Sequence, residues 1–194
     1  MSQLDDTKPE LNIELKRVVC EVHLRCHLDL KTIALNVSNV EYRNENNKNE
    51  LIIQLRKPEV TATVTSEGKI SCRSAVSEEE ARSGARCVAR IIQKKGFDVQ
   101  LRQMRVVEVE AKCTFPFQIM VHALVPFVIK VFYDGELEQY AIYKLPDLEA
   151  TLSIYPSGAV EVVAPTVEVA HKAIEHIYPL VEPFRRKPSA TVDA

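Results

Sequence analysis

The sequence predicts an α+β fold in which two copies of one unit form an antiparallel sheet that helices cover on one face. Residues 60–97 carry the first observation, because an alternating apolar and polar run, a turn at Gly68, a second alternating run and an amphipathic stretch follow one another. The second observation is that a similar pattern returns over residues 149–184, where Gly158 lies 90 residues after Gly68. A recurrence at a fixed offset indicates an internal repeat.

Composition and charge narrow the class of protein. The 194 residues suffice for one domain or two fused halves, and contents of 46% apolar and 27% charged residues are those of an ordinary soluble globule. No run approaches the roughly 20 apolar residues of a membrane span, and the acidic N-terminus is unlike a secretory signal. A formal net charge of −2 is unsuited to holding nucleic acid by charge alone, because that affinity comes from Lys and Arg meeting phosphates.

The cysteines are expected to be reduced thiols, mostly buried, in a cytosolic or nuclear protein, since their number is odd and no export signal is present. They are Cys20, Cys26, Cys72, Cys87 and Cys113. A metal site combining Cys20 and Cys26 with His23 and His27 is disfavoured, because on a strand the two cysteines point away from the two histidines. We therefore expect no metal and no cofactor.

The first copy is expected over residues 11–98, after a flexible tail of residues 1–10. In order, we expect a strand over 13–26, a short helix over 28–37, a strand from 38, a polar hairpin loop over 44–50, a strand over 50–55, the hairpin of 60–73 and a long helix. Ser77 opens that helix with Glu80 as a capping box, and Gly96 closes it. The helix's apolar stripe consists of Ala81, Ala85, Val88, Ile91 and Ile92.

The second copy is expected over residues 99–186, before a flexible tail of residues 187–194. In order, we expect a strand over 106–113, a short helix and a partly buried strand within 115–132, a turn at Asp134-Gly135, a strand to Leu145, a hairpin around Gly158 and a helix from about Thr166 to Leu180. Each copy thus contains about five strands, one short helix and one long helix. Short turns imply antiparallel pairing, and the two long helices would leave one sheet face open.

Several stretches also match one family in order and in residue type. They are CHLDLKTIALNVSNVEY (26–42), LRKPEVTATVTSEGKI (55–70), SEEEARSGARCVARIIQKKGF (77–97), ATLSIYPSG (150–158) and IEHIYPLVEPFRR (174–186). Over residues 13–186 the chain resembles the core of the TATA-box-binding protein (TBP) family, and in particular its divergent TBP-like factors. The resemblance implies the TBP saddle, a curved ten-strand antiparallel sheet with pseudo-twofold symmetry and helices on the convex face. It also implies a non-enzymatic, nuclear transcription factor of the pre-initiation complex of RNA polymerase II.

In that family the concave face binds the minor groove, where four Phe wedges unstack base steps and two Asn residues read the centre of the site. The resemblance assigns the wedge positions to Lys48 or its neighbour, Thr65, Glu138 and Tyr155, and the two Asn positions to Arg17 and Glu108. Only one of these residues is aromatic, and a tyrosine hydroxyl resists burial between bases. We therefore expect TATA-box binding to be lost or altered.

The resemblance, together with alternation along the strands, predicts which residues line this DNA-facing surface. They are Arg17, Val19, Glu21, Lys48, Thr65, Lys69, Ser71, Arg73, Glu108, Glu110, Glu138, Lys144, Tyr155 and Glu161, with Glu50 and Lys112 on the same row. Carboxylates there would repel phosphates and would have to shed water in a groove. The simpler interpretation, that alternating acidic and basic residues are only a solvated sheet face, leads to the same expectation about DNA.

The resemblance also implies two partner surfaces. In the family, factor IIB docks on the C-terminal stirrup, which corresponds here to Tyr133, Asp134, Glu136 and Leu137, with Gly135 in place of a proline. Factor IIA adds a strand to the sheet edge of the first half, and the matching positions are Ala34, Asn39, Glu41 and Arg56. Ordinary polar groups of a hairpin and an edge strand are the alternative interpretation.

The first long helix carries a basic stripe at spacing i, i+4. Arg82, Arg86, Arg90 and Lys94 form it, and in the family this convex side meets other proteins, although a solvated helix face has the same pattern.

Three functions are compatible with these residues. We expect a monomeric nuclear TBP-like factor that engages factors IIA and IIB, with no membrane partner and with weak or non-TATA DNA binding. The alternatives are a promoter DNA-binding protein of changed sequence preference, using Arg17, Lys48, Lys69, Arg73 and Tyr155, and, more remotely, a module of a nucleic-acid-processing enzyme, although no catalytic set is evident.

Overall fold

The computed structural model describes residues 11–45, 48–124, 130–133 and 139–186. The chain groups into two compact units by contact: the first unit is residues 15–110 and 163–170, and the second unit is formed by the remaining described residues. The N-terminal repeat contains β1 (Ile13–His23), α1 (Leu30–Asn36), β2 (Val40–Glu45), β3 (Lys48–Arg56), β4 (Glu59–Thr65), β5 (Lys69–Ala75) and α2 (Glu78–Gln93). The C-terminal repeat contains β6 (Arg102–Thr114), α3 (Val121–Leu124), β7 (Lys130–Tyr133), β8 (Gln139–Leu145), β9 (Ala150–Ile154), β10 (Ala159–Ala164) and α4 (Val167–Val181), with 3₁₀ turns η1 (Pro146–Leu148) and η2 (Glu182–Phe184).

The predicted α+β class is confirmed, and each repeat has the predicted five strands, short helix and long helix. In the first unit the strand order is β2-β3-β4-β5-β1-β6, and in the second it is β10-β9-β8-β7. The strand pairs β1–β5, β2–β3, β3–β4, β4–β5, β7–β8 and β8–β9 are all antiparallel. The repeat boundary expected at 98–99 remains a prediction.

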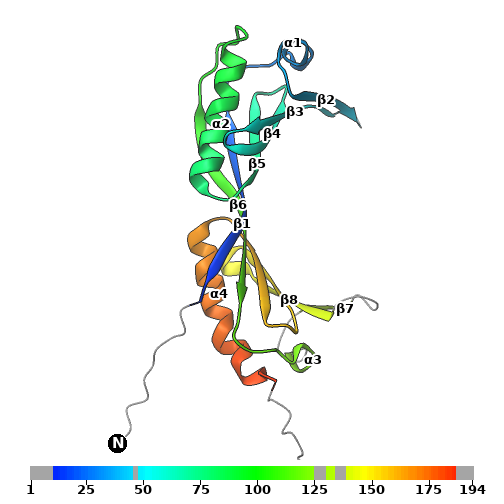
Figure 1. Cartoon of the computed structure of the whole chain (residues 1–194), viewed down its shortest axis with the longest axis vertical. Coiled ribbons are helices and arrows are strands. Elements are labelled where there is room, and N and C mark those ends of the chain that lie inside the picture. The colour runs from blue at the N-terminus through cyan, green and yellow to red at the C-terminus, as the bar shows by residue number, and fades with distance from the viewer. Residues whose placement is uncertain (1–10, 46–47, 125–129, 134–138, 187–194) are drawn as a thin grey trace, which may run out of the picture. The chain divides into compact units, whose positions relative to one another are not determined.

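One face of the first unit's sheet is covered by α2, which packs against β4 and β5 (Figure 1). Ala62 is paired with Cys72 and Val64 with Ile70, and all four side chains are buried on this face. The helix contributes Ala81, Gly84, Ala85, Val88, Ala89 and Ile92, whereas Ile91 of the predicted stripe is only half-buried. The opposite face of this sheet carries the polar members of the alternation and is called the open face below.

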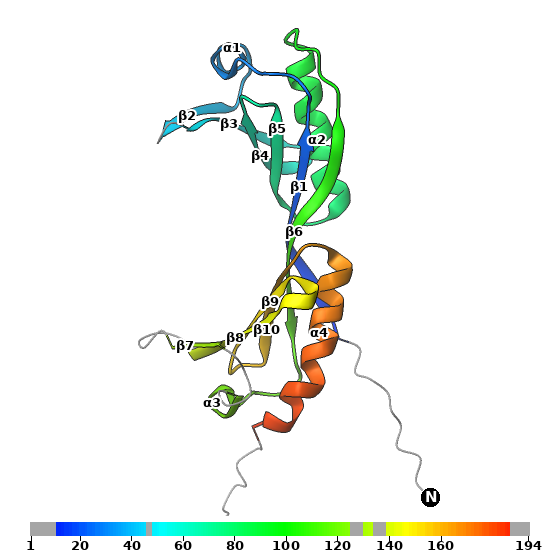
Figure 2. The ribbon, with the colours of Figure 1, turned by 180° about the vertical axis from the view of Figure 1, so that it is seen from behind.

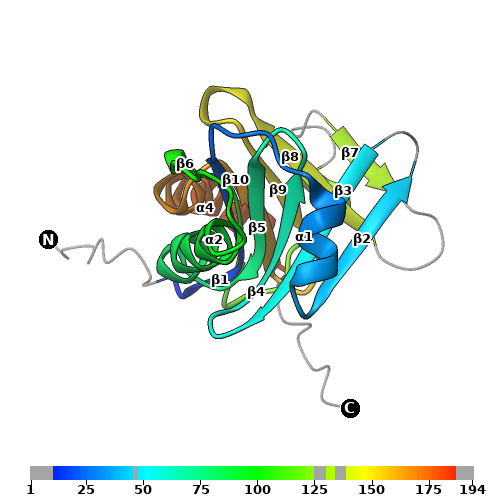
Figure 3. The ribbon, with the colours of Figure 1, turned by 90° about the horizontal axis from the view of Figure 1, so that it is seen from above.

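The N-cap of α2 is the predicted one. The Glu80 backbone N–H donates to Ser77 Oγ at 3.2 Å, and the Glu80 carboxylate accepts from the Val76 backbone N–H at 3.2 Å, one residue before the cap. The short helix α1 lies beside β2 and β3 (Figure 3) and begins at Leu30 rather than at 28, because the Asp29 carboxylate accepts from the N–H groups of Lys31 and Thr32.

Two expected boundaries are wrong. The first strand ends at His23, because Arg25 has a positive φ of 54° and the Leu24 N–H donates to the Gly68 carbonyl in the turn of β4 and β5. The predicted polar loop over 44–50 is mostly strand, since β2–β3 pairing continues to the last pair, Glu45 with Lys48. Polar side chains do not stop a ladder whose edge faces water.

A β-bulge in β5 explains why the repeat offset changes along the chain. Val18 pairs with Ala75, but two residues later Cys20 pairs with Cys72, so β5 contains one extra residue, and Ser74 has a positive φ of 68°. Gly158 lies 90 residues after Gly68, whereas the buried Ala170 of α4 lies 89 residues after the buried Ala81 of α2. The inserted residue is therefore absorbed by the bulge before the helix begins.

In the C-terminal repeat, α4 runs along β9 and β10 (Figure 2). Its buried side chains are Ala170, Ala173, Ile174, Ile177 and Val181, and the half-buried Val167 of the predicted stripe starts the helix. The end of α4 is anchored by an aromatic group, because Tyr178 packs edge-on to Phe115 at a centroid distance of 5.0 Å and contacts Phe117 at 5.9 Å.

Candidate functional site on the open face

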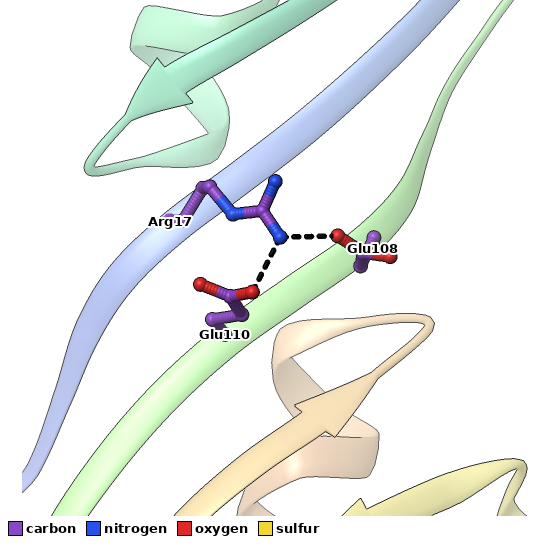
Figure 4. A network of polar contacts seen from close by, with 3 residues as sticks. All are labelled: Arg17, Glu108 and Glu110. Atoms are coloured by element: carbon purple, nitrogen blue, oxygen red, sulfur yellow. Dashed lines mark hydrogen bonds and ion pairs between the residues drawn. The ribbon is translucent and has the colours of Figure 1, made fainter.

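The open face of the first unit carries an ion-paired cluster of one arginine and two glutamates (Figure 4). Arg17 comes from β1, and Glu108 and Glu110 come from β6, two positions apart on the same face of that strand. Arg17 Nη2 lies 2.7 Å from Glu108 Oε1 and also donates to Glu110 Oε1. The neighbours Val18 and Val109 are fully buried, so alternation along each strand places Arg17 and Glu108 on the opposite, open face.

The charges of this cluster reinforce one another. The hydrogen bond from Arg17 lowers the pKa of Glu110, and the same contact raises the pKa of Arg17 against an opposing effect of burial. Arg17 and Glu110 therefore hold each other in their charged forms at neutral pH. Since the Arg17 side chain is 34% exposed, this is a screened surface network.

Two other described acids of the predicted surface, Glu21 and Glu161, also have basic neighbours. Lys69 Nζ lies 2.7 Å from a carboxylate oxygen of Glu21, whose side chain is only 17% exposed. In the second unit, Lys112 Nζ lies 3.8 Å from Glu161 Oε1. Each of these two carboxylates thus has a lysine within ion-pairing distance.

The wedge positions differ between the repeats. Thr65 is opposite Glu50 in the β3–β4 ladder, and its Oγ1 is buried without a hydrogen-bond partner among the described residues. Tyr155 stacks on Tyr140 at a centroid distance of 5.4 Å, and its hydroxyl donates to Glu161 Oε2 at 3.0 Å. Lys48 begins β3, but its side chain and the whole of Glu138 lie outside the described residues.

Tyr140 is the residue of this surface that sequence reasoning missed. Ala141 pairs with Ile154 in the β8–β9 ladder, so the residue before Ala141 faces the residue after Ile154 on the other side of the sheet. The apolar alternation of β8 and of β9, together with the length of the connection between these two strands, would have predicted their register and therefore this pair.

The other predicted members of the surface divide by accessibility. Val19 and Ser71 are almost covered, at 6% and 8% exposure, so they contribute to the floor of the face. Arg73 and Lys144 are exposed. Arg73 pairs with Thr61 across β4 and β5.

The predicted factor IIA positions lie near the edge of the first unit's sheet, where β2 is the outermost strand. Asn39 and Arg56 line one pocket of about 400 Å³ together with Gln54, Leu55 and Glu59. Glu41 accepts from Arg43 Nε at 2.7 Å, and Ala34 lies on α1. The structure therefore brings two of these four positions into one pocket.

Of the predicted factor IIB stirrup, the structure describes only Tyr133, the last residue of β7. Asp134, Glu136 and Leu137 lie outside the described residues, as does the turn expected at Asp134-Gly135.

The predicted basic stripe of α2 is not uniform. Arg82 turns toward β6, where its Nη1 donates to the Met104 carbonyl at 3.4 Å, and it lies 3.6 Å from Glu78. Arg86, Arg90 and Lys94 are exposed.

The cysteines are all free thiols, and Cys20, Cys72 and Cys113 are buried. Burial raises the pKa of Cys72 to about 12, so this thiol is inert. The described residues include no group of three or more His, Cys, Asp or Glu side chains arranged to hold a metal. None of the described helices is long and apolar enough to span a bilayer.

Comparison with known proteins identifies the family of this chain. The model of the family described as "Transcription factor TFIID (or TATA-binding protein, TBP)" matches residues 12–95 and 103–184. The chain is 41% identical over 180 residues to "TATA box-binding protein-like 1" of Danio rerio, which covers 91% of this chain and 94% of the relative.

More distant relatives agree. The chain is 36% identical to "TATA-box-binding protein" of Xenopus tropicalis, over 89% of this chain and 59% of the relative, and spans half the length of the mouse "TATA box-binding protein-like 2". The solved structure of Methanococcus jannaschii TBP has the same fold, with a TM-score of 0.78 at 23% identity, over 89% of this chain and 99% of that one. Because the family model covers both repeats and the zebrafish relative is matched almost from end to end, this chain belongs to the TBP family and is a TBP-related transcription factor.

Proposed function

We propose that this factor engages general transcription factors IIA and IIB in the nucleus, as a monomer, and binds TATA-box DNA weakly or not at all. The observation that carries the proposal is the cluster of Arg17, Glu108 and Glu110, because the family resemblance assigns the two base-reading Asn positions to the first two of these residues. Membership of a family of DNA-binding transcription factors supports the role in transcription. The chemistry of the open face supports the weak or absent binding of TATA-box DNA.

The cluster opposes entry into a minor groove for two reasons. A groove would strip water from Glu108 and Glu110, whose side chains are 41% and 38% exposed, and its phosphates would repel them. Kinking DNA costs a few kcal/mol for each unstacked step, which the family offsets with aromatic wedges. Thr65 has no aromatic ring to insert, and Tyr155 has its hydroxyl bound to Glu161.

The first-unit edge supports a factor IIA contact. β2 is the outermost strand and can accept another strand by hydrogen bonding along its free edge. The pocket beside it, lined by Asn39 and Arg56, presents an amide and a guanidinium for side-chain contacts. The factor IIB contact rests on the residue types of Tyr133, Asp134, Glu136 and Leu137, which keep the acids and the leucine of the family stirrup.

The test measures both activities with the full chain. Pull-down with purified factors IIA and IIB is expected to capture both, with Arg56→Ala weakening only the first and Glu136→Arg only the second, so that each variant is the control of the other. Fluorescence anisotropy with TATA and random duplexes is expected to show no preference. Loss of both factor contacts would refute the proposal.

The salt dependence of duplex binding distinguishes the proposed function from the alternative of a promoter DNA-binding protein. A steep fall of duplex affinity between 50 and 200 mM salt, together with a sequence preference, would identify a promoter DNA-binding protein with a changed target instead.

A further inference from the structure

The open face of the second unit carries a feature that the proposed function does not use. Tyr140 and Tyr155 form a stacked pair with a centroid distance of 5.4 Å and an interplanar angle of 30°. Both rings are half-buried, so each keeps surface accessible to solvent. Beside them, Glu161 accepts the Tyr155 hydroxyl at Oε2, and its side chain is 49% exposed.

We propose that this tyrosine pair and Glu161 form a docking site for an arginine side chain of a partner protein. A guanidinium is planar, stacks on a tyrosine ring and donates paired N–H groups to a carboxylate, so one arginine can use both parts of the site. The hydroxyl bond to Tyr155 holds the carboxylate beside the rings, which reduces the ordering needed on binding.

The local charges favour arginine over nucleic acid. A base could stack on the same rings, but the phosphates that accompany it would meet the carboxylate of Glu161. Lys112 does not prevent arginine binding, because its 3.8 Å contact to Glu161 is long, half-exposed and readily exchanged. Lysine is a poorer occupant than arginine, since an ammonium has no plane to stack on tyrosine.

The site is specific to one repeat. The cross-strand pair at the matching place in the first unit is Glu50 with Thr65, which has no aromatic surface. The two repeats therefore provide their own control, and the inference does not depend on contacts with factor IIA or IIB.

The experiment titrates the full ¹⁵N-labelled chain with a blocked Gly-Arg-Gly-Gly-Arg-Gly peptide and with its lysine counterpart, followed by NMR. Amide shifts of Tyr140, Tyr155 and Glu161 are expected to move with the arginine peptide, with affinity roughly tenfold above that of the lysine peptide. Tyr140→Ala and Glu161→Gln are each expected to weaken binding about tenfold, and His171→Ala, at an exposed position of α4, to leave it unchanged.

Tyr140→Phe, which keeps the ring, is expected to keep most of the affinity and guards against a folding artefact. Equal binding of the two peptides, shifts confined to other surfaces, or a dT oligonucleotide that shifts these amides at lower concentration than the arginine peptide would overturn the proposal.

Discussion

The two repeats are alike in the turn of one hairpin, β4–β5 in the first repeat and β9–β10 in the second. They differ in the side chains of the open face beside that turn. In both, a glycine of positive φ closes the turn: Gly68 at 81° and Gly158 at 89°. The carbonyl of this glycine accepts from the backbone N–H of the residue that follows the first strand of the repeat. That residue is Leu24, after β1, at 2.8 Å, and Phe115, after β6, at 2.9 Å. The cross-strand pair beside this turn is Glu50 with Thr65 in the first repeat, but Tyr140 with Tyr155 in the second.

This difference shows that the turn and the open face are constrained differently: close packing limits the residues at the turn, whereas the open face is in contact with solvent. The turn is closely packed, since a Cβ on Gly68 would lie 2.3 Å from the Cys26 carbonyl oxygen and one on Gly158 would lie 2.3 Å from that of Phe117. No side chain larger than hydrogen fits either place. The open face points to solvent, so its residues can diverge without disturbing the frame, and the two halves can acquire different partners.

The largest effect is expected from substitution of the turn glycine that both repeats share. Gly68→Ala and Gly158→Ala should each lower the free energy of unfolding by about 4 kcal/mol, because each adds a methyl group against a backbone oxygen at a left-handed φ. Urea denaturation measures this loss. The control is Gly96→Ala, whose φ is 94° but whose Cβ would meet nothing within 4 Å, so only about 1 kcal/mol of backbone strain is expected. Equal losses at all three glycines would contradict the packing argument.

A smaller effect compares the two long helices. Val88 of α2 and Ile177 of α4 occupy matching, fully buried positions. Ile177→Ala should cost about 3 kcal/mol and Val88→Ala about 1 kcal/mol less, since the valine loses one methylene fewer. Chemical denaturation followed by circular dichroism measures both. A larger loss at Val88 would show that the two helix–sheet layers pack to different densities.

The helix caps sharpen the comparison further. Ser77 Oγ accepts from the Glu80 N–H, and Thr166 Oγ1 accepts from the Val169 N–H, both at 3.2 Å. Ser77→Ala and Thr166→Ala should each cost about 1 kcal/mol of unfolding free energy. Substitution by Asn is the control, because it keeps a capping oxygen and should restore most of the stability.

The smallest effect concerns the ion-paired cluster, which belongs to the first unit. The pKa of Glu110 is lowered in the folded chain by its bond to Arg17, so its stabilising contribution is present above the unfolded value near 4.5 and is lost as the pH falls through the folded value. Arg17→Met should therefore flatten the fall of the melting temperature below about pH 4.5, with an effect under about 1 kcal/mol because the pair is half-exposed. Arg73→Met, at an exposed position of β5, serves as the control. Unchanged pH profiles in both variants would show that the cluster does not contribute.

Much of the fold follows from local patterns. Alternation with a period of two is a property of the strand itself, and it assigned Glu108 and Thr65 to the uncovered side of the sheet without any tertiary information, whereas Tyr155 was assigned there by the family resemblance. The cap at Ser77 and the turn glycines follow from backbone geometry in the same way. Boundaries failed where a long-range bond decided them, as at His23, where the strand stops because Leu24 bonds to Gly68.

The sequence alone therefore determined the repeat, the class of fold, the family resemblance and the side of the sheet on which each polar residue lies, because these depend on residues close together in the chain. Only the tertiary structure decided which of those residues meet: Arg17 with carboxylates 91 and 93 positions away, and Tyr140 with Tyr155. Strand register and the bulge at Ser74 determine which residues of neighbouring strands are in contact. A register shift of one residue would change each of these cross-strand partners.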